Sequence, residues 1–189
     1  MESRKFSIVK EAARLFRKQG YTATSMQDIA DELGIKAASL YNHISSKHEI
    51  LEQLLLSTAE DFVKGMRDIQ CSGLDPLQQL NRVIALHVRL TVEEPNKMAL
   101  VTQDWRNLDN EARSTFLKYR NSYDKDFRSI IQRGVDQGVF DLPNVDIAVF
   151  SILSTLRWFF SWYLKHKDLS PLELELYLQK TLLLGIIKS

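Results

Sequence analysis

The stretch Ser25–Lys47, SMQDIADELGIKAASLYNHISSK, is the most informative part of this chain, because it fits two short helices joined by a tight turn. The turn falls at Gly34, since glycine adopts the left-handed backbone that ends a helix without the steric cost of a β-carbon. Ser25 is suited to cap the first helix, with Asp28 as its capping-box partner three residues later. The pattern therefore predicts a helix-turn-helix, in which the second helix enters the DNA major groove.

The two predicted helices each have an apolar side that can pack and a polar side that can face a partner. Apolar residues of the first helix recur at three- and four-residue spacing, at Met26, Ile29, Ala30 and Leu33. The second helix has Leu40 and Ile44 as candidate buried anchors. Its other face carries small residues, hydrogen-bonding groups and a cation, which suit base edges and phosphates.

From this face we predict the DNA-contacting residues. Lys36, Ser39 and Asn42 are expected to face bases, with Ala37 allowing close approach of the backbone, and Ser25, Tyr41, His43 and Lys47 are expected to face phosphates. Ordinary structural interpretations compete with three of these roles. Ser25 could be only a local helix cap, Lys47 a solvated surface charge and Asn42 a bystander on the exposed face.

A wider segment carries a family resemblance. ARLFRKQGYTATSMQDIADELGI followed by SLYNHISSKHEIL gives an amphipathic helix, a Gly-aromatic turn, the two-helix motif and a closing lysine. In this order it resembles the N-terminal domain of TetR-type bacterial transcriptional repressors, over roughly the first quarter of the chain. Lys36 departs from the Ser or Thr that family members often have, which argues against phosphate capping there. Ile44 replaces the usual Phe in a packing role.

Size and charge fit this interpretation without proving it. The 189 residues can bury a real core or form two small subdomains that share a long helix. The formal net charge of +1 is small for a protein that coats nucleic acid, and an ordinary solvated surface would explain it. Residues 1–47 hold 8 basic and 5 acidic side chains, so the positive bias lies on the motif.

Helical periodicity continues to the end of the chain, and no alternating strand pattern appears. Beyond the motif, helices are predicted over about 3–19, 46 to Gly73, 76–94, 97–105, 109–137, 145–164 and from 171 onward. Capping pairs support three of the starts, at Ser46 with Glu49, Asp75 with Gln78, and Ser170 with Glu173.

The predicted fold is therefore all-α, with an N-terminal three-helix DNA-binding head and a C-terminal helical body for ligand binding and dimerisation. We place the helix-turn-helix DNA-binding domain at residues 1–47 and the effector-binding and dimerisation domain at 48–189.

The remaining composition argues for a cytoplasmic, non-catalytic protein. Cys71 is the only cysteine, and the N-terminal stretch lacks the apolar core of a signal peptide. The segment Ile147–Leu164 is the most membrane-like, but Arg157 in its middle would cost about 2.5–3.5 kcal/mol in a bilayer centre, so we expect a buried helix and no membrane partner.

No motif for catalysis, nucleotide binding or metal binding is visible, and the four histidines are too scattered for an obvious metal cluster. We expect no enzyme activity, no cofactor and no metal. Two alternatives stay open: an all-helical enzyme or carrier that uses a cavity, and a DNA-binding protein without an effector.

Aromatic residues of the predicted body helices could line an apolar cavity that has a few polar groups. The candidate effector-binding residues are His87, Gln103, Trp105, Arg106, Tyr119, Arg120, Tyr123, Phe127, Trp158 and Phe159. Their competing interpretation is structural: aromatic residues at helical spacing usually form core, a lone histidine there is usually hydrogen-bonded, and arginines pair with nearby carboxylates.

The runs QDWRNLDNEAR, YRNSYDKDFRSIIQRGVDQGVF and WFFSWYLKHKDLSPLELE resemble the C-terminal domains of the TetR subgroup that senses acyl-CoA thioesters. This resemblance implies a small-molecule effector of the acyl-CoA class. An arginine would meet its phosphate or an anion near the thioester, and the aromatic stripe would take the acyl chain.

The predicted helix 145–164 is apolar nearly all round, which suggests a second surface to bury. The TetR-like fold pairs its last two long helices with their copies in a four-helix interface, so the resemblance implies a homodimer. The candidate interface residues are Phe150, Leu153, Leu156, Phe160, Leu176, Leu183 and Ile187. Intrachain core is the competing interpretation for them.

Overall fold

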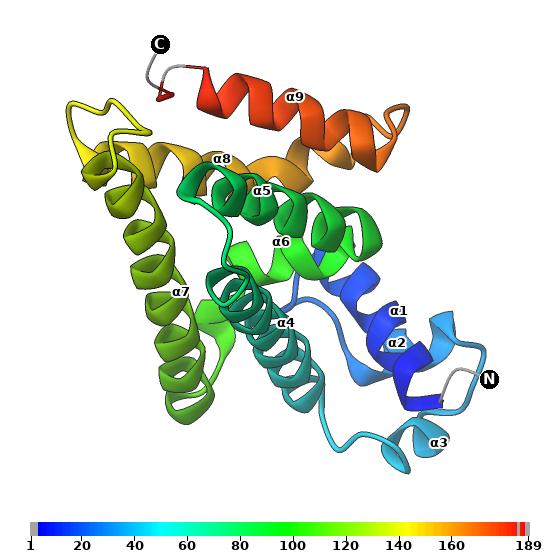
Figure 1. The fold of residues 1–189 in the computed structure, drawn as a ribbon. Coiled ribbons are helices and arrows are strands. Elements are labelled where there is room, and N and C mark those ends of the chain that lie inside the picture. The colour runs from blue at the N-terminus through cyan, green and yellow to red at the C-terminus, as the bar shows by residue number, and fades with distance from the viewer. Residues whose placement is uncertain (1–3, 185, 188–189) are drawn as a thin grey trace. The chain divides into compact units, whose positions relative to one another are not determined.

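The computed structural model describes residues 4–184 and 186–187, and over these residues the chain is helical, as predicted (Figure 1). The described part contains an isolated antiparallel bridge between Phe140 and Ile187 but no β-strand. The helices are α1 (Arg4–Gln19), α2 (Met26–Glu32), α3 (Ala37–Tyr41), α4 (Lys47–Gln70), α5 (Pro76–Glu93), α6 (Pro95–Gln103), α7 (Asn110–Asp136), α8 (Val145–Tyr163) and α9 (Pro171–Leu183), with a 3₁₀ turn at Trp105–Asn107. The predicted start of the first helix at residue 3 lies outside the described residues.

The chain divides into two compact units. The first consists of Met1–Ala59 with Asn96–Leu117, and the second of Glu60–Pro95 with Lys118–Ser189. The boundaries fall inside α4 and α7, so each of these helices contributes to both units. The predicted boundary at residue 47 was drawn between two expected functions, not between compact units. It stays a prediction.

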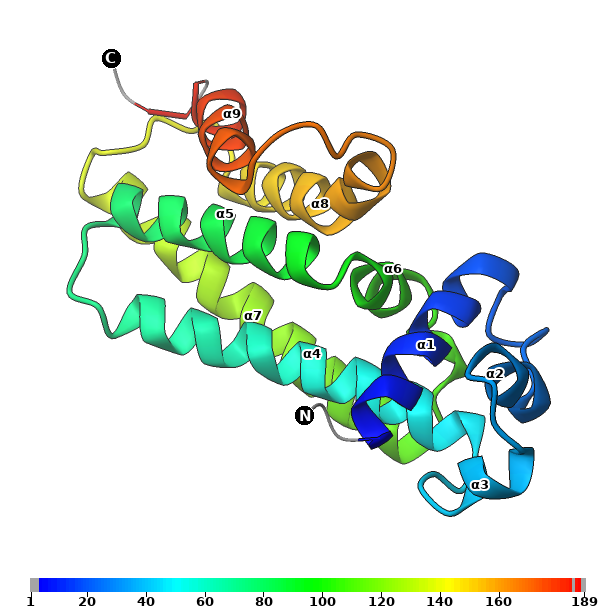
Figure 2. The same cartoon turned by 90° about the vertical axis from the view of Figure 1, so that its right-hand side faces the viewer.

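In the first unit, α2 packs against both α1 and α3, which Figures 1 and 2 show at the blue and cyan end of the chain. Phe16 of α1 and Ile29 of α2 are fully buried here, and Leu40 and Ile44 are buried as predicted. The turn at Gly34 has a φ of 65°, the left-handed conformation that the sequence indicated. The helix-turn-helix therefore has its own apolar core.

The second helix of the motif is shorter than predicted. It ends at Tyr41, and Asn42 and His43 lie in the turn that follows. The amides of His43 and Ile44 both donate to the carbonyl of Leu40, at 3.0 and 3.2 Å. These bonds close the chain behind α3 and lead it toward α4.

Most predicted helix starts are confirmed. Complete capping boxes are present at Ser25 with Asp28, Asp75 with Gln78, and Ser170 with Glu173. The helix predicted at 97–105 instead spans Pro95–Gln103, because proline is well tolerated in the first helical turn, where its missing amide costs nothing.

The fourth predicted box, Ser46 with Glu49, forms only in part. The Ser46 hydroxyl accepts from the Glu49 amide at 3.1 Å, but the Glu49 carboxylate accepts from the amide and hydroxyl of Ser45, both at 2.8 Å. Ser45 binds one carboxylate oxygen of Glu49 with two donors, its amide and its hydroxyl, whereas the Ser46 amide could offer only one donor. Lys5 binds the other oxygen at 3.1 Å.

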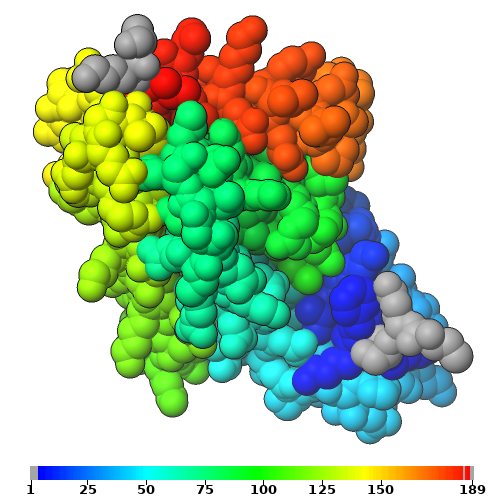
Figure 3. All heavy atoms as spheres, viewed as in Figure 1, coloured from blue at the N-terminus to red at the C-terminus, as the bar shows by residue number. Residues whose placement is uncertain are grey.

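In the second unit, α5 packs against α8 and α9 (Figures 1 and 2), and Figure 3 shows α9 with the segment before it, in orange and red, at the surface of this unit. Leu80 and Ile84 of α5 and Phe127 of α7 are fully buried. Phe140 packs so closely on α7 that a β-carbon at Gly134 would lie 2.1 Å from its ring. Glycine is therefore required at that helical position.

Candidate functional site

The polar edge of the helix-turn-helix is accessible. Tyr41 has 53% of its surface exposed, and Leu40 beside it is buried. Ala37 is half-buried. The other predicted DNA-facing residues of α3, its N-cap and the following turn are exposed, namely Lys36, Ser39, Asn42 and His43. The face predicted to meet base edges therefore lies at the surface, although which bases or phosphates each residue meets stays a prediction.

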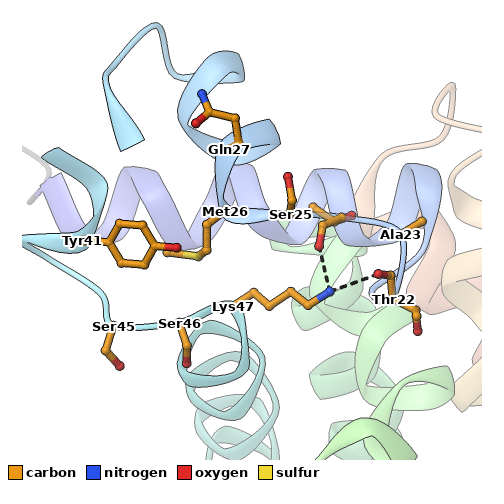
Figure 4. Close-up of a pocket in the computed structure, with 10 residues that line it drawn as sticks. Thr22, Ala23, Ser25, Met26, Gln27, Tyr41, Ser45, Ser46 and Lys47 are labelled. Carbon is orange, nitrogen blue, oxygen red and sulfur yellow. Dashed lines mark hydrogen bonds between the residues drawn. The ribbon is translucent and has the colours of Figure 1, made fainter. Parts of the chain in front are cut away.

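A shallow groove of about 560 Å³ adjoins this face (Figure 4). One side is the segment Thr22–Gln27, and the other is Tyr41 with Ser45, Ser46 and Lys47. The groove thus brings together three of the four residues predicted to face phosphate. Its many hydroxyl groups are suited to donate to phosphate oxygens.

Sequence reasoning missed several residues of this groove, above all Thr22, Gln27, Ser45 and Ser46. Thr22, Ser45 and Ser46 belong to two short hydroxyl-rich connections, one before α2 and one before α4, whereas Gln27 lies in the first turn of α2. That enrichment was the available signal. The prediction from the sequence considered mainly the second helix and, apart from Ser25, did not include the connections before α2 and α4.

Ser25 caps α2, which was the structural alternative to its predicted phosphate contact. Its hydroxyl oxygen accepts from the Asp28 amide at 3.1 Å, and the same hydroxyl donates to the Asp28 carboxylate at 2.8 Å. The Ser25 amide also donates to that carboxylate, and this bond is the main reason that the pKa of Asp28 is lowered. A phosphate contact by Ser25 stays a prediction.

Lys47 forms contacts that neither of its predicted roles included. Its ammonium donates to the carbonyls of Tyr21, Thr22 and Thr24, at 3.0, 3.1 and 2.8 Å, and Figure 4 draws the bond to Thr22. It also lies 4.8 Å from the centre of the Tyr21 ring. Since an ammonium has three donors, these bonds use all of them. Lys47 therefore ties the segment before α2 to the start of α4, and its predicted phosphate contact stays a prediction.

The predicted effector-binding residues are divided between the two units. Gln103, Trp105 and Arg106 belong to the first unit, where Arg106 lies 4.7 Å from the Trp105 ring centre. The other seven belong to the second unit. Of these, Phe127 and Phe159 are buried and Trp158 is largely exposed. Asp124, a carboxylate near Arg120 in the sequence, pairs with Arg157 of α8.

His87 and Tyr123 form a buried polar pair in the second unit. The His87 Nε2 lies 2.9 Å from the Tyr123 hydroxyl, and the imidazole ring packs 4.7 Å from the Phe62 ring. Burial, with a smaller contribution from the charge of Arg157, lowers the pKa of His87 to about 3. Burial also raises the pKa of Tyr123. Both groups are therefore neutral at pH 7, and the hydrogen bond supports the core interpretation of His87.

Helix α5 carries further polar atoms that are buried without a hydrogen-bond partner among the described residues. They are the Asn81 Oδ1, the His87 Nδ1 and the Thr91 Oγ1. His87 and Thr91 are one helical turn apart and so share a side of α5. An unsatisfied buried polar group costs about 1–3 kcal/mol, so these atoms are suited to water or to a polar ligand group. Asn81 and Thr91 were not predicted, although Thr91 lies one helical turn after His87, which was.

The burial of His87 predicts acid sensitivity. Its pKa is about 3 in the folded chain against an ordinary 6.5, so the unfolded chain binds more protons between these values. Stability from this group is complete above pH 6.5 and is lost as the pH falls toward 3, by up to about 1.4 kcal/mol per pH unit. Urea unfolding at pH 7.5 and pH 5 should show a smaller loss in His87→Gln than in the original chain. His166→Gln, at an exposed histidine, is the control, and equal losses in all three proteins would contradict the prediction.

The predicted dimer-interface residues fall into two groups. Phe150, Leu176 and Ile187 are exposed, with Phe150 at 72%. Leu153, Leu156, Phe160 and Leu183 are already buried within one chain, as the competing core interpretation expected. Other large apolar residues exposed on or beside α8 and α9 are Ile147, Trp158, Trp162, Leu172, Tyr177 and Leu184.

These exposed side chains leave α8 only partly buried. Among the described residues it is the helix whose length and composition would allow it to cross a membrane, and 33% of its most apolar window is buried. The prediction of a buried helix therefore holds for part of α8 only. Its remaining apolar surface has no cover within the described chain.

A helix-turn-helix with an accessible second helix, followed by a larger helical unit, defines a DNA-binding transcriptional regulator. Residues 8–54 match the family model of bacterial regulatory proteins of the tetR family, and residues 73–186 match the tetracyclin repressor-like C-terminal domain. The second match alone spans more than half of the chain. This chain belongs to the TetR family.

Several similar proteins are named as transcriptional regulators. The repressor KstR2 of Rhodococcus jostii is 28% identical over 163 residues, which cover 85% of this chain and 79% of that protein. The solved structure of the ketosteroid transcriptional regulator KstR2 of Mycobacterium tuberculosis has a TM-score of 0.92 at 26% identity and covers 100% of this chain and 97% of its own. PfmR of Thermus thermophilus has a TM-score of 0.82 at 32% identity, covering 94% and 97%.

A more distant structure has the same fold. AibR, solved in complex with isovaleryl coenzyme A and operator DNA, has a TM-score of 0.79 at 21% identity and covers 95% of this chain and 97% of its own.

Proposed function

We propose that this chain is a ligand-responsive repressor that binds operator DNA as a homodimer and releases it when a small-molecule effector binds. The accessible face of α3 beside the hydroxyl-lined groove carries the DNA part of this proposal. Base edges would meet Lys36, Ser39 and Asn42, and phosphates would meet the groove. That KstR2 relatives are repressors supports repression as the outcome.

The homodimer part is supported by the uncovered apolar residues of α8 and α9, chiefly Phe150 and Leu176. Exposed patches of this kind commonly mark protein–protein interfaces. A twofold dimer would present two copies of α3 to successive major grooves, about 34–36 Å apart. Operator half-sites should therefore be centred about one helical turn of DNA apart.

The effector part is supported by the unsatisfied polar atoms of α5 beside the aromatic residues of the second unit. A few polar atoms in apolar surroundings are suited to orient a largely apolar ligand. An acyl-CoA is the class that the C-terminal sequence resembles. AibR holds isovaleryl coenzyme A and DNA in the same fold, which supports this class as sterically possible.

Release would follow if the effector favours a dimer in which the two heads no longer fit successive grooves. Helix α4 is the covalent element that begins in the DNA-binding unit and ends in the second unit. A coupling free energy of about 1.4 kcal/mol would already lower operator affinity tenfold.

Footprinting on the DNA upstream of the chain's own gene tests the repressor part. The expected result is one protected site with two related half-sites, and absence of protection there and on genomic fragments would contradict it.

Titration calorimetry with acyl-CoAs of increasing chain length tests the effector. Binding heat should fall in Thr91→Val and persist in Thr155→Val, an exposed threonine of α8.

The outcomes also separate the alternatives. Turnover of a bound compound would favour an enzyme or carrier, and operator binding unaffected by every acyl-CoA would favour a DNA-binding protein without an effector of this class.

A further inference from the structure

The first unit contains a cluster of three metal-binding side chain types that the DNA-binding surface does not use. His48 and Glu52 are one turn apart near the start of α4, and Asp109 directly precedes α7. One imidazole nitrogen and two carboxylate oxygens lie within 4.8 Å of one another. All three residues belong to the same compact unit. The chain thus folds a nitrogen donor and two oxygen donors together around one point.

His48 directs one ring nitrogen into this cluster and the other away from it. The His48 Nδ1 lies 3.4 Å from the Tyr21 hydroxyl. The His48 Nε2 is buried and has no hydrogen-bond partner of normal geometry among the described residues. It faces an oxygen of Asp109 at 3.4 Å. An imidazole nitrogen and two carboxylates whose ligand atoms gather this closely are suited to share one cation.

Asp109 is held in place by the start of α7. Its Oδ1 accepts from the Ala112 amide at 2.9 Å. The other oxygen, Oδ2, is the one directed at His48. The side chains of His48 and Asp109 are 35% and 56% exposed, so an ion can reach them from solvent.

We propose that His48, Glu52 and Asp109 bind one divalent transition metal ion, for which Zn²⁺ is the best fit. Zinc accepts imidazole nitrogen and carboxylate oxygen at about 2.0–2.2 Å, and three protein ligands leave a fourth position for water. Two donors at that bond length and a tetrahedral angle are separated by about 3.4 Å. The His48 Nε2 and Asp109 Oδ2 already have this separation, at 3.4 Å.

The types of ligand also determine which metal ion the site prefers. Mg²⁺ and Ca²⁺ prefer oxygen ligands alone, whereas an imidazole ligand favours zinc and related ions. Tyr21 would orient the imidazole through its other nitrogen, as outer-shell partners of metal-bound histidines do. The bound ion would link the start of α4 to the residue that caps α7. This proposal is independent of the proposed repressor function.

Titration calorimetry of the full-length, untagged and chelator-treated chain with ZnCl₂ tests the site. We expect one Zn²⁺ per chain and no comparable binding of MgCl₂. His48→Gln and Glu52→Gln should each weaken Zn²⁺ binding about tenfold or more, because each removes one of three ligands. His166→Gln, which changes an exposed histidine of the second unit, should leave the affinity unchanged.

Two measurements guard against a variant that fails to fold. Circular dichroism without metal should give the same helical signal for all variants, and Glu52→Gln, at a half-buried helical position, serves if His48→Gln does not fold. Absence of Zn²⁺ binding would overturn the proposal. So would an affinity that His48→Gln and Glu52→Gln leave unchanged, or Mg²⁺ binding as tight as that of Zn²⁺.

Discussion

Replacing Leu40 by alanine should abolish operator binding. Within α3, all of whose residues the structure describes, only Leu40 is buried, and its exposed fraction is 0%. A five-residue helix is not stable by itself, so tertiary packing must hold it. Removing a buried leucine side chain costs about 2–5 kcal/mol. That loss falls on the buried side chain of α3, the helix that packs against α2.

Hydrogen exchange and DNA titration together check this expectation. In Leu40→Ala the amides of residues 36–44 should lose protection while those of α8 keep it, and operator affinity should fall by two orders of magnitude or more, which corresponds to about 2.7 kcal/mol. Ser39→Ala on the exposed side of the same helix is the matched control for folding. Operator binding by Leu40→Ala within a few-fold of the original affinity would show that α3 does not depend on this anchor.

Replacing Lys47 by methionine should destabilise the first unit and thereby weaken DNA binding. Methionine keeps much of the apolar stem but removes the ammonium that binds the carbonyls of Tyr21, Thr22 and Thr24. Thr24 is buried, so its carbonyl region has little access to replacement water. We expect a loss on the order of 2 kcal/mol in unfolding free energy, since charge-assisted hydrogen bonds contribute about 1.5–3 kcal/mol each before solvent screening.

The salt dependence of DNA binding separates this role from the predicted phosphate contact. A phosphate contact by Lys47 would lower the slope of log affinity against log salt by about one unit and leave folding stability unchanged. A structural tie instead lowers the urea midpoint and leaves the slope unchanged. Lys36→Met, at an exposed lysine of the same motif, should keep the urea midpoint. A Lys47→Met variant with the original midpoint and a reduced slope would rule out the structural tie as its main role.

Local sequence signals predicted much of the fold. The turn at Gly34, the capping boxes at Ser25, Asp75 and Ser170, and the all-helical class are all confirmed. Two local predictions were wrong because neighbouring residues compete for the same hydrogen-bond acceptor. Ser45 takes the Glu49 carboxylate from Ser46, and the second motif helix ends at Tyr41. Several donors were near enough in sequence to compete, and the tertiary fold decides which one binds.

The candidate sites were predicted less completely than the helices. Residue type and helical phase identified Leu40 as an anchor and Tyr41 as exposed, because both follow from the position of a residue around a helix. They did not separate Phe150, which is exposed, from Leu153, which is buried, since both are apolar residues of an apolar helix. That distinction depends on which elements cover each side of α8.

Local sequence patterns indicated where most helices start and that the chain turns at Gly34, because those features depend on groups within about four residues of each other. The long-range partners depend on tertiary packing instead. In the folded chain, the Lys47 ammonium binds carbonyls more than 20 positions earlier, and His87 lies within hydrogen-bond distance of Tyr123, 36 positions later. Tertiary packing also brings Asp109 close to His48, although the spacing of the histidines had indicated no metal cluster. Such contacts depend on how packed helices bring distant segments together, which periodicity and capping patterns do not encode.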